Sequence, residues 1–385
     1  MKTIRFGIIG GGLMGKEFVS AAARWCHLLD APARPEIVSV CSARESTLAW
    51  FKSCLPLGTE FTTDYRKLLD NPEIDAVYIA VPHHLHQEMY IAAVEAGKHF
   101  LGEKPFGIDK PANDAILAAI GKHPNLLVRC SSEFPFYPAV QKIGQLLEQN
   151  AFGHILEVST GFLHSSDLDP NKPINWKRQV EFNGEYGCMG DLGMHVCHVP
   201  FRAGITPLNV RAILSNVYTE RLDGKGNRVP KTTWDNATLL TLSRDRRNNN
   251  GPQGALFPWT LKTHRIAPGQ KNSWYIEILG TKTSVRWSTH DPKRLELLRY
   301  EGSDQTWQHL QVGYEPTYKT ITGPIFEFGF TDAMLQMFAA YVYELAGQAP
   351  RQLLAMTVTP EETALSHRLF SAALQSQRDN AVVEV

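Results

Sequence analysis

The stretch IRFGIIGGGLMG, residues 4–15, decides how the first part of this chain folds. Its apolar half has the composition of a buried β-strand, and a helix pattern begins at Lys16. Between them Gly10, Gly12 and Gly15 keep the G-x-G-x-x-G spacing of a turn that brings backbone amides close to a pyrophosphate. Gly10 suits the tight turn, Gly12 leaves room for phosphates, and Gly15 lets helix and strand pack closely. The stretch therefore predicts a dinucleotide-binding turn.

Length and composition narrow the class of protein. The chain has 385 residues, enough for two domains, and its 39 Lys and Arg balance its 39 Asp and Glu. This balance favours neither a nucleic acid nor an anionic membrane as partner. No run reaches the length of a transmembrane helix, and the six cysteines lack CxxC spacing. Because the first strand begins by Ile4, it leaves no room for a signal peptide, and we expect a reduced, cytoplasmic protein.

The pattern of elements changes along the chain. Strand and helix patterns alternate over residues 1–130, which predicts a Rossmann domain with a doubly wound parallel sheet. Residues 131–385 predict an α+β domain with a large, mainly antiparallel open sheet, so the fold class is α/β followed by α+β. Its strands are expected at 154–163, 207–218, 236–244, 254–265, 273–280, 282–288 and 294–300, and its helices at 138–149, 331–346 and 360–377. Such a sheet commonly buries a face against a second subunit, and we expect a homodimer or homotetramer.

The end of the second strand bears on the choice of dinucleotide. It reads Ser42-Ala43-Arg44, where dinucleotide folds often carry an acid that binds the adenosine ribose diol. A hydroxyl beside a guanidinium suits a 2′-phosphate, which favours NADP over NAD. Two alternatives stay open: Glu45 stands close enough to reach a diol, and Arg44 can be a solvated residue at a helix start.

Two further strand ends carry candidate residues. Pro82-His83-His84-Leu85-His86 follows one strand, and we expect His83 or His86 to pack against the nicotinamide half, with a purely structural role for all three histidines as the alternative. A metal site is not expected, because no nearby Cys, Asp or Glu completes a tetrahedral set. Glu103-Lys104-Pro105 follows the next strand, where Lys104 can act as an acid or base or as a hydrogen-bond donor to a reacting hydroxyl. The residues expected to contact the cofactor are Gly10, Gly12, Leu13, Met14, Gly15, Ser42, Arg44, Pro82, His83, His86, Glu103 and Lys104.

A second motif lies in the C-terminal half, at residues 187–195, GCMGDLGMH. Asp191 and His195 are spaced i and i+4, so on a helix they share one face. A carboxylate one turn from an imidazole can orient it, which suits a base that takes a hydroxyl proton during hydride transfer. The structural alternative is a buried Asp–His pair that fastens the helix.

Together the G-x-G-x-x-G turn, Glu103-Lys104-Pro105 and the Asp191 motif resemble the Gfo/Idh/MocA oxidoreductase family over essentially the whole chain. The resemblance implies NAD(P)-dependent hydride transfer at a hydroxyl-bearing carbon of a sugar or cyclitol. It places Lys104, Asp191 and His195 on catalytic positions, with His195 as acid/base and Lys104 polarising the substrate oxygen. Asp191 would orient the substrate or His195.

Two departures from that family matter for the substrate. An arginine often found before the first helix of the second half is replaced here by Glu133-Phe134-Pro135-Phe136, and the acid often found shortly after the catalytic histidine is missing. Trp176 offers a flat face for a sugar ring, while Lys177 and Arg178 could bind an anionic substituent. The residues expected to bind substrate are Lys104, His164, Trp176, Lys177, Arg178, Asp191 and His195.

Two other functions stay open from the sequence. Some members of the family oxidise a sugar transiently, eliminate the aglycone, add water and reduce again, which gives an NAD-dependent glycosidase. Candidate bases for that reaction are His83, His164, Tyr186 and His264. A non-catalytic NAD(P)-sensing protein is the third possibility, and the joint presence of the three catalytic positions argues against it.

Overall fold

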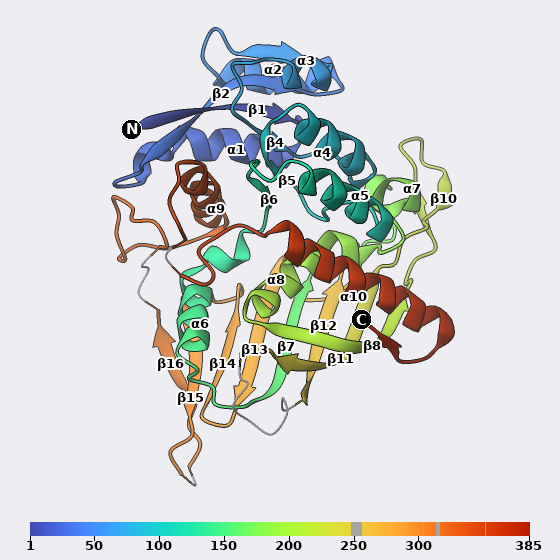
Figure 1. Cartoon of the computed structure of the whole chain (residues 1–385). Helices are drawn as coiled ribbons and strands as arrows, with labels where there is room; N and C mark the ends of the chain where they lie inside the picture. Colours follow the sequence, from blue (N-terminus) through green and yellow to red (C-terminus); the bar gives the residue numbers. More distant parts are fainter. Residues whose placement is uncertain (248–255, 303, 313–315, 351) are drawn as a thin grey trace. The chain divides into compact units, whose positions relative to one another are not determined.

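The computed structural model describes residues 1–247, 256–302, 304–312, 316–350 and 352–385 (Figure 1). The chain forms two compact units. The first unit consists of Met1–Phe136 with Tyr314–Pro360, and the second of Tyr137–Gly313 with Glu361–Val385. The units are therefore not two consecutive stretches divided near residue 130, because a late segment of the chain returns to the first unit.

The first unit is built on a six-stranded parallel sheet with strand order β3-β2-β1-β4-β5-β6. This is the order of a Rossmann fold, which confirms the predicted doubly wound sheet. The strands are β1 (Lys2–Ile9), β2 (Ala33–Cys41), β3 (Glu60–Thr62), β4 (Ala76–Ile79), β5 (His99–Gly102) and β6 (Val128–Cys130). The helices between them are α1 (Leu13–Ala23), α2 (Glu45–Cys54), α3 (Tyr65–Leu69), α4 (His86–Glu95) and α5 (Lys110–Gly121).

The late segment completes the core of this unit. Helix α9 (Phe330–Leu345) lies beside α1 (Figure 1). Its buried Phe338 packs against Phe18 of α1 and Tyr78 of β4, with ring centroids 4.6 and 5.2 Å apart. Arg129 of β6 also donates through Nε and Nη2 to Glu344 of α9, at 2.9 and 2.7 Å. Helix α9 thus covers one face of the Rossmann sheet.

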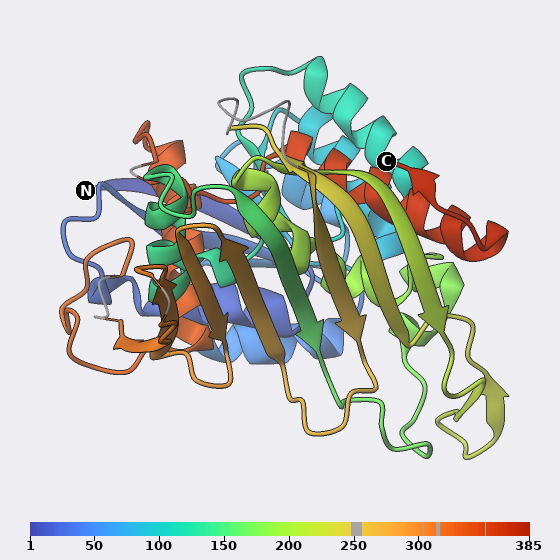
Figure 2. The same ribbon diagram turned by 90° about the horizontal axis from the view of Figure 1, so that it is seen from below.

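The second unit is built on a sheet that has nine strands among the described residues, in the order β16-β15-β14-β13-β7-β12-β11-β8-β17. Figure 2 shows it as one continuous layer. Every neighbouring pair is antiparallel except β7 and β12, so the expectation of a mainly antiparallel sheet is confirmed. The strands are β7 (Ile155–Leu163), β8 (Ile205–Ser215), β11 (Asn236–Asp245), β12 (Leu256–His264), β13 (Ser273–Gly280), β14 (Thr283–Ser288), β15 (Arg294–Arg299), β16 (Gln308–Gln311) and β17 (Val383–Glu384).

Helices cover one face of this sheet (Figure 1). They are α6 (Pro138–Glu148), α8 (Met194–Arg202) and α10 (Pro360–Asp379), while the short helix α7 (Val180–Asn183) and the hairpin β9 (Glu220–Leu222) and β10 (Arg228–Pro230) lie outside the sheet. The expected strand at 254–265 corresponds to β12, and its first two residues lie outside the described part of the chain. Elements without a sequence-based expectation include β3, α5, α7, β9, β10, β16 and β17.

Candidate active site

The glycine turn has the geometry that a dinucleotide needs. Gly10 has φ +120°, and a Cβ added there would overlap the carbonyl oxygen of Ala80 at the end of β4. A Cβ at Gly15 would overlap the carbonyl oxygen of Gly10, so α1 and the turn pack backbone to backbone. A Cβ at Gly12 would meet no described atom within 4 Å. The turn is therefore closed on the protein side and open beside Gly12, where the first amides of α1 can bind phosphate oxygens.

The residues after this turn line the start of α1. Gly12 is the N-cap, and the amides of Leu13 and Met14 belong to the first helical turn, which has no intrahelical acceptor. The Leu13 side chain is 69% exposed, whereas Met14 packs against the core. Any cofactor contact of these two residues would therefore be made by their backbone.

At the end of β2, Ser42 Oγ lies 2.5 Å from Thr47 Oγ1, and a Cβ added at Gly11 would touch both hydroxyls. The two hydroxyls thus border the glycine turn, and Arg44 beside them is exposed. Glu45, which the sequence analysis kept as an alternative partner for a ribose diol, forms an ion pair with Lys52 Nζ at 2.5 Å.

The histidines after β4 are placed unequally. His86 is fully buried, and its ring nitrogens lie 2.6 Å from the carbonyl oxygen of Pro105 and 2.9 Å from that of Val81. Burial lowers the pKa of His86 to about 4, although both carbonyls oppose this. His86 therefore ties the end of β4 to the turn after β5. His83 is also buried, Pro82 is partly exposed, and His84 is exposed.

Lys104 follows β5 and is partly exposed, while the acids around it are buried. Glu103 Oε1 accepts hydrogen bonds from Tyr78 Oη at 2.6 Å and Ser131 Oγ at 2.7 Å. Burial raises the pKa of Glu133 to about 7, with Glu103 adding to the shift and Lys104 opposing it. The sequence named Glu133 only as a departure from a family pattern, yet its charge interacts with that of Lys104.

The Asp191 motif of the second unit is not a regular α-helix throughout. Met189–Gly193 is π-helical and runs directly into α8, so Asp191 and His195 stand on either side of a change in helix type. Asp191 is 1% exposed. Its Oδ1 accepts from Lys177 Nζ at 2.9 Å, and its Oδ2 pairs with the Arg265 guanidinium. Two cationic side chains thus contact the buried Asp191 carboxyl group.

His195, at the start of α8, is held in an aromatic surround. Trp274 Nε1 donates to its backbone carbonyl oxygen at 2.9 Å, and the Phe162 ring meets the imidazole edge-on at 5.6 Å. The His164 ring packs against the same Phe162 at 4.6 Å. The side chain of His195 is 6% exposed. The backbone of His195 is therefore fixed independently of its imidazole.

The loop before the Asp191 motif contains a buried ion pair. Arg178, 3% exposed, pairs through Nε with Asp167, which is 1% exposed. Burial alone would raise the pKa of Asp167, but Arg178, Arg265 and Lys172 outweigh it and lower the pKa to about 2. Trp176 is partly exposed, with Lys177 Nζ 5.5 Å from its ring centroid. The sequence had suggested that Arg178 could bind an anionic group of the substrate. In the structure its charge is paired with that of Asp167.

Of the three predicted catalytic residues, Lys104 belongs to the first unit, and Asp191 and His195 to the second. The sequence did not identify Arg265. The one available signal for Arg265 is its position directly after β12, next to His264, which the sequence had proposed as a base. His264 Nε2 lies 3.1 Å from Thr238 Oγ1, and Tyr186 Oη lies 2.8 Å from Ser371 Oγ, so both side chains have structural partners.

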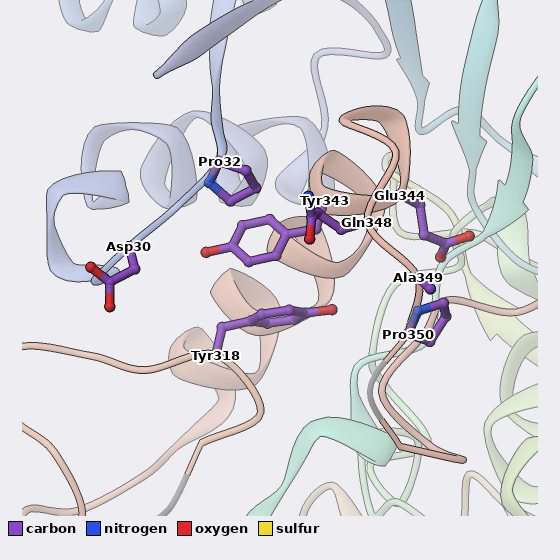
Figure 3. Close-up of a pocket in the computed structure, with 8 residues that line it drawn as sticks. All are labelled: Asp30, Pro32, Tyr318, Tyr343, Glu344, Gln348, Ala349 and Pro350. Atoms are coloured by element: carbon purple, nitrogen blue, oxygen red, sulfur yellow. The ribbon is translucent and has the colours of Figure 1, made fainter.

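A separate cavity of about 240 Å³ lies in the first unit, lined by Asp30, Pro32, Tyr318 and Tyr343 among others (Figure 3). Pro32 directly precedes β2, so the cavity lies at the amino ends of the parallel strands, opposite the glycine turn. It contains none of the predicted site residues. Over the described ranges no group of three or more His, Cys, Asp or Glu side chains is placed to hold a metal ion. Within the same part of the chain, no helix combines the length and apolar character needed to cross a membrane.

Comparisons of the sequence and of the fold identify known proteins to which this chain is similar. The model of an oxidoreductase family with an NAD-binding Rossmann fold matches residues 4–128. Levoglucosan dehydrogenase of Pseudarthrobacter phenanthrenivorans is 31% identical over 344 residues, covering 86% of this chain and 83% of that protein. The uncharacterized oxidoreductase YrbE of Bacillus subtilis is 30% identical over 305 residues, covering 77% of each. A solved structure of levoglucosan dehydrogenase, in complex with NADH and levoglucosan, is similar with TM-score 0.85 and 25% identity, covering 100% of this chain and 99% of that one.

Proposed function

This chain belongs to the Gfo/Idh/MocA oxidoreductase family and is an NAD(P)-dependent sugar oxidoreductase, and we propose that its substrate is a neutral monosaccharide or anhydro-sugar. The buried ion pair between Arg178 and Asp167 is the observation that supports an uncharged substrate. Since both side chains are buried and oppositely charged, Arg178 offers no net charge to a carboxylate or phosphate. Lys177 likewise already shares a hydrogen bond with Asp191. These contacts support recognition of hydroxyl groups.

The residues of the chain would divide the work as follows. The Gly10–Gly15 turn would hold the pyrophosphate of a nicotinamide dinucleotide, which would supply the hydride acceptor or donor. We propose that His195 takes the proton of the substrate hydroxyl on its imidazole, and that Lys104 Nζ donates a hydrogen bond to the same oxygen. Asp191, held between Lys177 and Arg265, keeps its charge and takes no proton. Its role is to fix the donors around the substrate.

The choice between a neutral and an acidic sugar can be tested with two matched compounds. Glucose and glucuronate differ at one carbon, so the ratio of their kcat/KM values isolates the carboxylate. We expect glucose to be favoured by about tenfold or more, because a carboxylate placed beside Asp191 would be repelled and poorly solvated. The measurement is the initial rate of reduced-cofactor formation, and equal or better turnover of glucuronate would remove the proposal of a neutral substrate.

We also propose a preference for NADP, supported by Ser42, Thr47 and the exposed Arg44 at the end of β2. Glu45 is engaged by Lys52, which leaves the hydroxyl and guanidinium groups to meet a 2′-phosphate. Arg44→Ala should lower kcat/KM for NADP⁺ about tenfold and leave that for NAD⁺ unchanged. Arg34→Ala, at an exposed arginine on β2, serves as the control and should change neither value. An Arg44→Ala enzyme with the wild-type ratio of the two values would contradict the preference.

A homo-oligomer is proposed from the open face of the second unit's sheet. Ile213 of β8, Leu240 of β11 and Leu256 of β12 are 64, 50 and 51% exposed on neighbouring strands. A cluster of this kind is the usual start of a subunit contact. Light scattering should give the mass of two or four chains, and a monomer at micromolar concentration would exclude the assembly.

A further inference from the structure

Asp167 joins four segments of the second unit. Its carboxylate pairs with Arg178 Nε and, at 3.2 Å, with Lys172 Nζ. Its backbone carbonyl accepts from Arg221 Nη2 of β9 at 2.6 Å, and a second Arg221 nitrogen donates to the carbonyl of Asp169 at the same distance. Arg221 is 1% exposed. The loop that carries Trp176 and Lys177 is therefore fixed at its base by buried charges.

Arg265 connects this loop to the Asp191 motif. Its backbone carbonyl accepts from the Asp167 amide at 3.2 Å, and its own amide donates to the Asp235 carbonyl at 3.0 Å. Its guanidinium pairs with Asp191 Oδ2 and is close enough to Asp167 and Arg178 for their charges to interact with it. One residue thus touches the loop through its backbone and the catalytic motif through its side chain.

Each buried charge in this network has a partner of opposite charge. Arg178 and Arg265 are two buried cations, and Asp167 and Asp191 are the buried carboxylates that pair with them. Removing one partner of a buried pair leaves the other charged and poorly solvated, so its surroundings must move or it must change protonation state. Two lysines of this network, Lys172 and Lys177, have about a third of their side chains exposed, at 36 and 35%. Lys177 is the one that contacts the Asp191 motif. The Lys177 ammonium pairs with the same Asp191 carboxylate as Arg265.

We propose that Arg265 is a positioning residue for the reaction: it fixes Asp191 as a carboxylate and couples it to the Asp167 loop, so that Lys177 and His195 keep their places toward the substrate. The inference rests on the proposed sugar oxidoreductase function and deepens it. Arg265 touches neither substrate nor cofactor in this role; it acts through Asp191.

The test compares Arg265→Gln, Arg265→Lys and Asp167→Asn in the full-length enzyme, with Arg228→Gln at an exposed position of β10 as the matched control. Arg265→Gln should lower kcat/KM with a neutral sugar about 100-fold, mostly in kcat, as expected for misplaced reacting groups. Arg265→Lys, which keeps the charge, should restore part of the loss. The effects of Arg265→Lys and Asp167→Asn should be less than additive, because both act on one network. Cofactor affinity should stay at the wild-type value in all four variants.

The pH profile separates this role from a purely structural one. The charged groups that face Asp191 include Lys177 and Arg265, and the charged and titratable groups that face Arg265 include Asp167, Arg178 and the Cys188 thiol. Loss of the Arg265 cation should make the neighbouring Asp191 carboxylate easier to protonate. The acid limb of the kcat/KM profile should therefore move to higher pH in Arg265→Gln and stay in place in Arg228→Gln. If Arg265→Gln does not fold, the activities of Arg265→Lys and Asp167→Asn test the role of Arg265. An active wild type with fully active Arg265→Lys and Asp167→Asn overturns the role of Arg265, whereas a wild type that turns over no sugar overturns the proposed function.

Discussion

His195→Asn should lower kcat about 1,000-fold, which is the usual loss when a positioned acid/base is removed. The expectation rests on how this residue is held. Since Trp274 bonds its backbone carbonyl, the start of α8 should keep its place when the imidazole is exchanged for an amide. The loss should therefore appear in kcat with little change in KM or in the affinity for cofactor. Stopped-flow or steady-state rates of reduced-cofactor formation measure it.

The matched control is His154→Asn, at an exposed histidine before β7 in the same unit. It should leave kcat within about twofold of the wild type. A His195→Asn enzyme that keeps a tenth or more of the wild-type kcat would show that another group takes the proton. His164, packed on the same Phe162 ring, would then be the first residue to examine.

Gly10→Ala and Gly12→Ala should differ in their effects on folding, and Gly12→Ala should also weaken cofactor binding. Gly10 has a positive φ and no space for a Cβ against Ala80, so its substitution should lower the free energy of unfolding by about 3 kcal/mol. Gly12 has φ −77° and open space, so Gly12→Ala should unfold like the wild type. That open space is where the phosphates are expected. Gly12→Ala should therefore weaken cofactor binding about 100-fold.

Denaturant unfolding and cofactor titration of the same two samples separate these effects. Gly121→Ala, at the end of α5 with open space around it, controls for the added methyl group and should alter neither property. If Gly12→Ala binds NAD(P)H as tightly as the wild type, the phosphates lie elsewhere and the role of the turn is wrong.

The parts of the fold that could be predicted are those that local pattern determines. The strand, turn and helix around Gly10 follow from side-chain size and glycine spacing over a dozen residues. Both elements occur there, although β1 begins at Lys2, before the predicted Ile4, and α1 begins at Leu13, before the predicted Lys16. The alternating apolar positions of β11 and β13 likewise gave their bounds within a residue. In each case the information lies within one element.

The parts that could not be predicted depend on contacts between distant segments. Helix α9 has the pattern of a buried helix, but nothing in its sequence says that Phe338 packs on Phe18. The pairing of Arg265 with Asp191 depends on where β12 ends in the sheet, which periodicity does not reveal. The π-helical segment before His195 could not be predicted either, because the i and i+4 spacing of Asp191 and His195 does not distinguish a π-helix from an α-helix. Arg178 and His86 appeared available to ligands because their buried partners, Asp167 and two backbone carbonyls, belong to other segments.

The central claim is net hydride transfer between a sugar and the cofactor, and counting products tests it most directly. Purified enzyme is incubated with excess NAD(P)⁺ and a neutral sugar or its glycoside, and reduced cofactor, oxidised sugar and released aglycone are measured together. Net transfer predicts one reduced cofactor for each sugar consumed and no aglycone. Aglycone released without accumulation of reduced cofactor would contradict it and identify the oxidoreductive glycosidase instead.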